Sequence, residues 1–156
     1  MNPKLSATER SIFIVSSEFN ESIINNLLQG AIDAFIYHGG KESALQIYRV
    51  PGALEIPGTI QQIIKFHNPH AIVAIGAVIR GETPHFDFVA GESAKGLLEI
   101  SLVSNIPIIN GILTTNNFKQ AEERSKSGER NKGWDAMEAA LKTINVYQKI
   151  FSASKC

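Results

Sequence analysis

The side chains best suited to chemistry lie in one short segment, residues 76–89, with the sequence GAVIRGETPHFDFV. It leads from an apolar stretch through a polar loop into a predicted helix, in which Thr83 can serve as N-cap and Pro84 fits the first position. A helix N-terminus exposes free backbone N–H groups and a partial positive charge, so an anion, above all phosphate, can bind there. His85 would stand beside that anion, and an imidazole carries protons near neutral pH. The segment therefore predicts an anion site and a proton carrier in one place.

Three other side chains have both a chemical and a plainer interpretation. Arg124 offers a planar guanidinium that can hold phosphate at two points, or it is a solvated charge at a helix end. Phe19 can be a stacking platform for a flat heterocycle, or a buried staple at the start of a helix. Glu55 can accept hydrogen bonds from ligand hydroxyls, or it supports the start of its own helix. For Arg80 a structural ion pair is the expected role.

Length and composition limit the classes of protein to consider. The 156 residues favour one domain, with residues 1–10 as a flexible segment and residues 11–156 as the folded unit. Fifteen Lys and Arg balance 15 Asp and Glu, which gives no basic field for nucleic acid. The apolar stretches are too short to span a bilayer, and residues 1–10 lack a hydrophobic signal core, so we expect a cytoplasmic protein without membrane partners. The only cysteine, Cys156, is the last residue and cannot form an internal disulfide.

Apolar patterns predict alternating strands and helices. Short apolar runs predict strands at residues 12–16, 44–50, 71–79 and 107–113. Periodic apolar positions and helix-start residues predict helices at residues 23–36, 57–67, 85–104, 117–124 and 134–151. The inward face of the helix over 85–104 is expected to carry Phe86, Val89, Ala90, Leu97 and Leu98.

This alternation indicates right-handed βαβ units and a three-layer α/β/α sandwich around a parallel sheet. Open parallel sheets bind ligands beyond the carboxyl ends of their strands. Those ends fall at residues 18–20, 50–55 and 79–85 and after Leu113, where the unusual side chains also lie. The fold and the motifs therefore predict the same site.

Six motifs occur in order along the chain: FN at 19–20, VPGALEIP at 50–57, IGAVIRGETPHFDFV at 75–89, GILTT at 111–115, QAEER at 120–124 and NKG at 131–133. With these motifs the chain closely resembles the 6,7-dimethyl-8-ribityllumazine synthase family over nearly its whole length beyond the first ten residues. The resemblance implies a four-stranded parallel sheet in the flavodoxin-like order, with the N-terminal strand adding to a neighbouring subunit's sheet.

The resemblance also implies a transferase reaction of riboflavin biosynthesis. The family condenses 5-amino-6-(D-ribitylamino)uracil with 3,4-dihydroxy-2-butanone 4-phosphate to give 6,7-dimethyl-8-ribityllumazine, phosphate and water, without a metal or an organic cofactor. Matching the motifs position by position assigns pyrimidine stacking to Phe19, the ribityl loop to Ala53, Leu54 and Glu55, and backbone beside the uracil to Ala77, Val78 and Ile79. The same matching assigns the phosphate side to Glu82, Thr83, Arg124 and Lys132, and proton transfer to His85.

One position departs from the family pattern. Many members have a phenylalanine, contributed by the adjacent subunit as a cover for the heterocycle, where this chain has Asn110. The resemblance implies a homopentamer with active sites between adjacent subunits, or twelve pentamers in a hollow shell, and riboflavin synthase as a candidate partner.

Two other functions are compatible with parts of these patterns. One is a non-catalytic flavin- or lumazine-binding protein that uses the same pocket; the presence of His85 and Arg124 argues against it. The other is a flavodoxin-like nucleotide-binding module. That class needs a glycine-rich phosphate loop after the first strand, and residues 16–20 contain no glycine.

Overall fold

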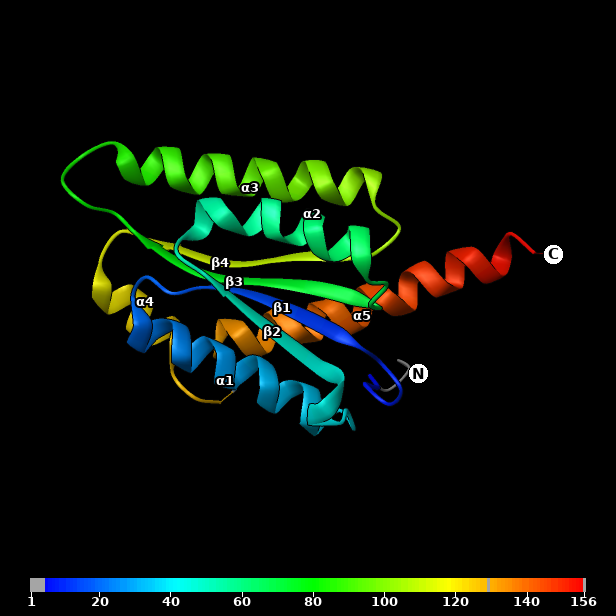
Figure 1. Ribbon diagram of the computed structural model, residues 1–156. Helices are drawn as coiled ribbons and strands as arrows, with labels where there is room; N and C mark the ends of the chain where they lie inside the picture. The colour runs from blue at the N-terminus through cyan, green and yellow to red at the C-terminus, as the bar shows by residue number, and fades with distance from the viewer. Residues whose placement is uncertain (1–4, 129, 156) are drawn as a thin grey trace.

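The computed structural model describes residues 5–128 and 130–155, which form a parallel four-stranded sheet between two helical layers (Figure 1). The strands are β1 (Ile12–Ser17), β2 (Leu45–Val50), β3 (Ala71–Ile79) and β4 (Ile108–Thr115). The helices are α1 (Glu21–Tyr37), α2 (Ile56–Phe66), α3 (His85–Val103), α4 (Phe118–Ser125) and α5 (Lys132–Ala153), with short 3-10 turns at η1 (Glu42–Ala44) and η2 (Ala53–Glu55). The strand order is β2-β1-β3-β4, which confirms the predicted α/β sandwich and its flavodoxin-like order.

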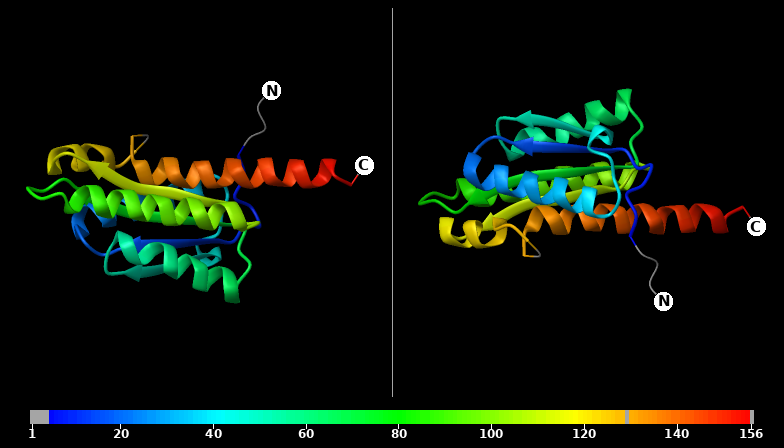
Figure 2. Two further views of the ribbon diagram at one scale, coloured as in Figure 1. Left: turned by 90° about the horizontal axis from the view of Figure 1, so that it is seen from above. Right: turned by 90° about the horizontal axis from the view of Figure 1, so that it is seen from below.

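The two central strands are apolar throughout because both of their faces are covered. In β1, Ile12 and Ile14 pack with α1 and α5, whereas Phe13 and Val15 pack with α2 and α3. Figure 2 shows the same division, with α2 and α3 on one face and α1, α4 and α5 on the other. Each fully buried isoleucine of these layers contributes roughly 1.5–3 kcal/mol of hydrophobic stabilisation.

Most element ends lie within one or two residues of the sequence prediction, and two of the differences have a clear structural cause. Strand β4 continues to Thr115 instead of stopping at Leu113, because it stays in register with β3 as far as the Ile79–Thr115 pair. Helix α5 begins at Lys132 instead of Trp134, because the side chain of Asn131 caps it.

The expected inward face of α3 is partly wrong. Leu97 is buried, but the neighbouring Leu98 is 60% exposed. Phe88, Leu102 and Val103 are also more than half exposed. Consecutive leucines cannot both face one sheet from a helix, since residues one apart point about 100° away from each other. Helix α3 therefore keeps an uncovered apolar side within a single chain.

The N-terminal segment lies against the domain from residue 5 onward. Ala7 is fully buried and its backbone N–H donates to the carbonyl oxygen of His38 at 2.8 Å. Residues 1–4, part of the segment expected to be flexible and to join a neighbour's sheet, lie outside the described residues, and residues 5–11 contain no strand.

In the described part of the chain, no helix is both long and apolar enough to cross a membrane.

Candidate functional site

A cavity of about 430 Å³ opens at the carboxyl ends of β1 and β3. Strand β1 has β2 on one side and β3 on the other. The connections that follow β1 and β3 therefore run in opposite directions along the sheet and leave a gap between them. Such a switch point is the expected ligand site of an open parallel sheet, and this volume suits a small organic molecule. The connections that line the cavity are those after β1, β2 and β3.

The first wall comes from the end of β1 and the turn into α1. It consists of Ser17, Phe19 and Asn20. Phe19 is 73% exposed, so it is not a buried helix staple, and its ring is accessible to a flat ligand. Asn20 adopts a left-handed backbone conformation (φ 68°), which asparagine tolerates, and its Nδ2 donates to the carbonyl oxygen of Ala77 at 3.2 Å. That bond ties the Phe19 turn to β3.

The second wall is the connection from β2 to α2. Pro51 and Gly52 lead into the η2 turn, where Ala53 is buried while Leu54 and Glu55 are exposed to the cavity. The backbone N–H of Glu55 donates to the carbonyl oxygen of Gly52 at 3.2 Å, which closes the turn. The Glu55 carboxylate therefore stands at the cavity, able to accept hydrogen bonds from hydroxyl groups.

The third wall is the end of β3 together with the start of α3. Ala77, Val78 and Ile79 line the cavity from the strand, and Thr83 and His85 line it from the loop and the helix start. Glu82 lies between the lining residues Gly81 and Thr83 but is not itself part of the lining.

The predicted cap of α3 is wrong. Helix α3 begins at His85 with Pro84 as N-cap, and no side chain, including that of Thr83, accepts a cap hydrogen bond there. Thr83 precedes the N-cap by one residue, so its hydroxyl is not in the capping position.

Arg124 does not reach this cavity. It lies in the last turn of α4, which packs on the α1/α5 face of the sheet through the buried Ala121. The cavity is walled by the turn into α1, the η2 turn, and the end of β3 with the start of α3, and no residue of α4 lines it. Arg124 is exposed, and its Nη1 donates to the carbonyl oxygen of Gln120 at 3.3 Å. The single chain thus separates Arg124 from His85.

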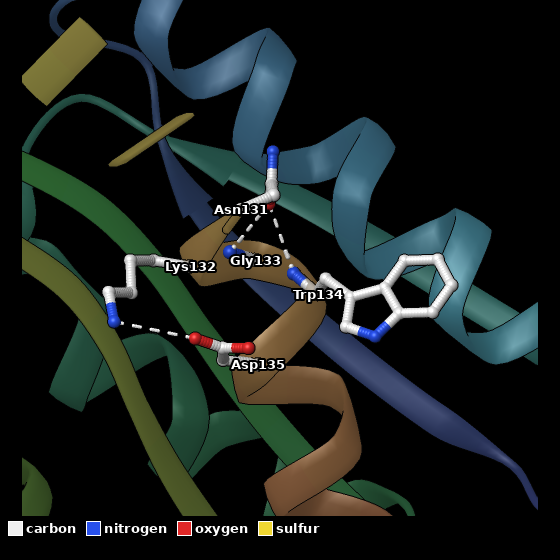
Figure 3. Close-up of polar contacts among 5 residues, drawn as sticks. All are labelled: Asn131, Lys132, Gly133, Trp134 and Asp135. Atoms are coloured by element: carbon white, nitrogen blue, oxygen red, sulfur yellow. Dashed lines mark hydrogen bonds and ion pairs between the residues drawn. The ribbon is translucent and has the colours of Figure 1, made fainter. Parts of the chain in front are cut away.

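Lys132 is also outside the cavity, at the first position of α5 (Figure 3). Asn131 is fully buried; its Oδ1 accepts from the backbone N–H groups of Gly133 and Trp134, and its Nδ2 donates to the carbonyl oxygens of Asn26 and Ser125. Gly133 is required because a Cβ there would collide with the carbonyl oxygen of Leu27 in α1. This close packing turns Lys132 toward β4, where its Nζ lies 3.4 Å from Asp135 Oδ2.

Asn110 lies on β4, the edge strand of the sheet. It is exposed, and its Oδ1 accepts from the backbone N–H of Ile112 at 3.0 Å, which leaves the amide N–H groups directed elsewhere. Asn110 and Lys132 line one groove of about 280 Å³ between β4 and α5, and Asn110 also lines a groove of about 400 Å³ between β4 and α3. Asn110 and Lys132 therefore lie together on the β4 edge.

Several lining residues were not assigned a ligand-binding role from the sequence: Ser17, Asn20, Pro51, Gly52, Gly81, Phe86 and Val89. Asn20 had a usable signal, because an asparagine between a strand and a helix often takes a left-handed conformation. Phe86 and Val89 had none, since apolar residues in a first helical turn are equally expected in the core. Among the described residues, no group of three or more His, Cys, Asp or Glu side chains is arranged to hold a metal ion.

The fold and the cavity define a class: a parallel α/β domain of flavodoxin-like order with an organic-ligand site at its switch point and no glycine-rich phosphate loop after β1. The family model described as 6,7-dimethyl-8-ribityllumazine synthase matches residues 9–148. The chain belongs to this family, whose members are transferases of riboflavin biosynthesis.

Similar proteins carry the same name. One from Campylobacter hominis is 45% identical over 148 residues, which cover 94% of this chain and 95% of the relative. One from Campylobacter lari is 44% identical over 142 residues, 91% of each chain. One from Chlorobium limicola is 41% identical over 145 residues, 93% of this chain and 94% of the relative.

Proposed function

We propose that this chain condenses 5-amino-6-(D-ribitylamino)uracil with 3,4-dihydroxy-2-butanone 4-phosphate to give 6,7-dimethyl-8-ribityllumazine, phosphate and water. The observation that carries the proposal is that one cavity gathers an exposed aromatic ring, a hydroxyl-binding carboxylate and an imidazole: Phe19, Glu55 and His85. These are the groups needed to stack a pyrimidine, hold a ribityl chain and move protons beside them.

The proposed reaction begins when the 5-amino group of the pyrimidine attacks the ketone and water leaves, giving an imine. Phosphate is then eliminated, the resulting enol tautomerises, and the ribitylamino nitrogen closes the ring with loss of a second water. His85 would donate and accept the protons of these steps. Both substrates are intrinsically reactive, so most of the acceleration should come from holding them together in a reactive pose.

The phosphate partners are supplied in this proposal by a second copy of the chain. Arg124, Lys132 and Asn110 lie outside the cavity of their own subunit, on α4, α5 and the β4 edge. A neighbouring copy that placed its β4 edge over the cavity would bring an arginine and a lysine to the phosphate beside Thr83, and Asn110 to the heterocycle. The head-to-tail repeat of such a contact gives a ring when its rotation closes after a whole number of copies, and the homopentamer expected from the resemblance is such a ring.

The uncovered apolar side of α3 supports assembly. Four large apolar side chains of this one helix, Phe88, Leu98, Leu102 and Val103, are each more than half exposed, as expected for a helix that packs against another subunit. We infer a homopentamer in the cytoplasm, with riboflavin synthase as its candidate partner. Light scattering on the purified protein distinguishes a pentamer from a shell of twelve pentamers.

The experiment that tests the activity is incubation of the purified protein with both substrates, followed by lumazine fluorescence and phosphate release. We expect both signals to rise together, and we expect His85→Ala to lower kcat by at least about tenfold, the low end for a proton carrier because the substrates also react unaided. Absence of product from the wild-type protein would contradict the enzymatic function and favour the non-catalytic binding protein. An unchanged kcat in His85→Ala would contradict the role of the imidazole alone.

A further inference from the structure

The start of α3 needs support from outside the helix. Its N-cap is Pro84, which has no side-chain acceptor, so no side chain caps the helix. The first turn is closed only by the backbone N–H groups of Asp87 and Phe88, which donate to the Pro84 carbonyl oxygen at 3.1 and 3.4 Å. A Cβ added to Gly81 would meet nothing within 4 Å, which places this part of the connection away from other packed groups. Yet His85 is the first residue of this helix, and its imidazole must keep a fixed place at the cavity.

Arg80 supplies contacts to this turn. Its guanidinium carbon lies 4.5 Å from the ring centroid of Phe86, and its Nη2 lies 3.6 Å from Oδ1 of Asp87. Phe86 and Asp87 are the two residues that directly follow His85. The ion pair is largely exposed, with 47% of the Arg80 side chain accessible, and contributes little by itself. The stacked guanidinium is the stronger restraint because it fixes a plane as well as a distance.

The other side of the same guanidinium is anchored to the turn between β4 and α4. Arg80 Nε donates to Oδ1 of Asn116 at 3.0 Å, and the Arg80 backbone N–H donates to the carbonyl oxygen of Thr115 at 2.8 Å. This turn is itself fixed: the Asn116 backbone N–H donates to Gln120 Oε1 at 2.8 Å, and the Gln120 backbone N–H donates to Asn117 Oδ1 at 2.9 Å. Arg80 thus connects the first turn of α3 to a rigid neighbouring element.

We propose that Arg80 is a positioning residue for the reaction: its guanidinium fixes the first turn of α3, and with it His85, against the turn between β4 and α4. Arg80 does not line the cavity, so it acts through the helix and not on the substrates. The inference rests on the proposed role of His85. A displacement of about 1 Å of a catalytic group can lower a rate by up to about 100-fold, so a loosened turn would have a measurable effect.

The chemistry of the contacts requires arginine. A lysine keeps the positive charge and can pair with Asp87, but it has neither a plane to stack on Phe86 nor an in-plane N–H for Asn116. If Arg80 acted only through its charge, Arg80→Lys would restore the rate. If it acts through geometry, Arg80→Lys remains impaired.

The test compares Arg80→Gln and Arg80→Lys in steady-state kinetics with both substrates. We expect kcat to fall by about tenfold in Arg80→Gln, with each KM within about twofold of wild type and an unchanged thermal midpoint. Arg80→Lys should recover less than half of the lost rate. Arg10→Gln is the matched control, because Arg10 also donates to an amide oxygen, that of Gln148 at 3.0 Å, but lies at the amino end of β1, away from the cavity.

A second comparison separates positioning of His85 from any other effect. In a His85→Ala background, Arg80→Gln should change the residual kcat by less than about twofold, because there is no imidazole left to position. A tenfold loss in that background would overturn the inference, as would a raised KM for the butanone phosphate with normal kcat, full recovery in Arg80→Lys, or an unchanged kcat in Arg80→Gln. Failure of the proposed function itself would be recognised earlier, as absence of product from the wild-type protein.

Discussion

The cavity at the ends of β1 and β3 and the exposed edge at β4 differ in how completely one chain builds them. The cavity has walls from three connections, and the Asn20–Ala77 hydrogen bond joins two of them. The β4 edge carries Asn110 and Lys132 beside shallow grooves, with Arg124 on the following helix. The first region is a pocket with walls from a single chain, whereas the second is a set of polar groups beside open grooves.

Residues that belong to the motifs of one family need not lie at one site within a single subunit: His85 lines the cavity, whereas Arg124 and Lys132 lie outside it. Strand β4 is the last strand of the sheet, and α4 and α5 return on the α1/α5 face. The connection after β4 therefore leads away from the cavity. In the proposed function, the site that needs both groups combines two copies of the chain.

The largest expected effect concerns the buried cap that fixes Lys132 on the β4 side. Asn131→Asp should lower the free energy of unfolding by about 3–5 kcal/mol, because the new carboxylate faces two carbonyl oxygens without water. Asn117→Asp is the matched control: this exposed cap of α4 uses only its acceptor, so the change should stay within about 0.5 kcal/mol. Urea unfolding at pH 7 and one fixed protein concentration measures both, and equal losses would show that burial of Asn131 does not matter.

The next prediction is that a change on the β4 side affects the KM of only one of the two substrates. Arg124→Ala should raise the KM for the butanone phosphate by about 10–100-fold, the loss of one or two hydrogen bonds to a charged group. The KM for the pyrimidine should change little. Lys126→Ala, an exposed cation just after α4, serves as control and should behave like wild type. An Arg124→Ala enzyme with unchanged kinetics would remove α4 from the site.

A smaller effect is expected on the cavity side. Phe19→Ala should raise the KM for the pyrimidine by about tenfold, since stacking a base on an aromatic ring contributes about 1–3 kcal/mol. Phe19→Tyr keeps the ring and should stay close to wild type. Phe66→Ala removes another exposed aromatic, at the far end of α2, and should not alter either KM. If Phe19→Ala and Phe66→Ala behave alike, stacking at Phe19 is excluded.

Much of the fold follows from the sequence. The continuous apolar run of β3 predicts a strand covered on both faces, and the paired apolar positions of α1 predict its buried stripe; both are confirmed. The end of α3 nearest the cavity was predicted less well, because Thr83 fits a cap by residue type and only the backbone geometry excludes it.

The split of the site was less accessible to sequence reasoning. The sequence places Arg124 after the carboxyl end of β4, which suggests a position beside His85. It does not show that the next helix, α4, packs on the α1/α5 face of the sheet. The role of Asn131 was equally hard to predict. Its NKG motif can be recognised in the sequence, but its hydrogen bonds to Asn26 and Ser125 depend on the packing of α1 against α5.

The smallest effect lies at neither region, but at the amino ends of the two central strands, and provides a reference for pH effects on the site. Burial, together with the charge of Arg10, lowers the pKa of His70, whose Nδ1 accepts from the backbone N–H of Ser11 at 2.9 Å. The folded state thus favours the neutral ring. The contribution of His70 to stability is complete above its unfolded pKa of about 6.5 and is lost as the pH falls through the lowered folded pKa.

His70→Asn keeps an acceptor near the Nδ1 position without titrating. Urea unfolding between pH 7.5 and 5 should therefore show a flatter decline for His70→Asn than for wild type, while kcat at pH 7.5 stays unchanged. Identical slopes in the two proteins would contradict the assignment.

The most direct test of the central claim is complementation between His85→Ala and Arg124→Ala chains, co-expressed with different tags and purified as mixed assemblies. If the cavity of one copy is completed by the β4 side of the next, random assembly in a ring restores about one quarter of the sites to wild type. At low butanone phosphate concentration, the mixed assemblies should then be several times more active than either variant alone. Activity equal to the average of the two variants would contradict a site shared between subunits.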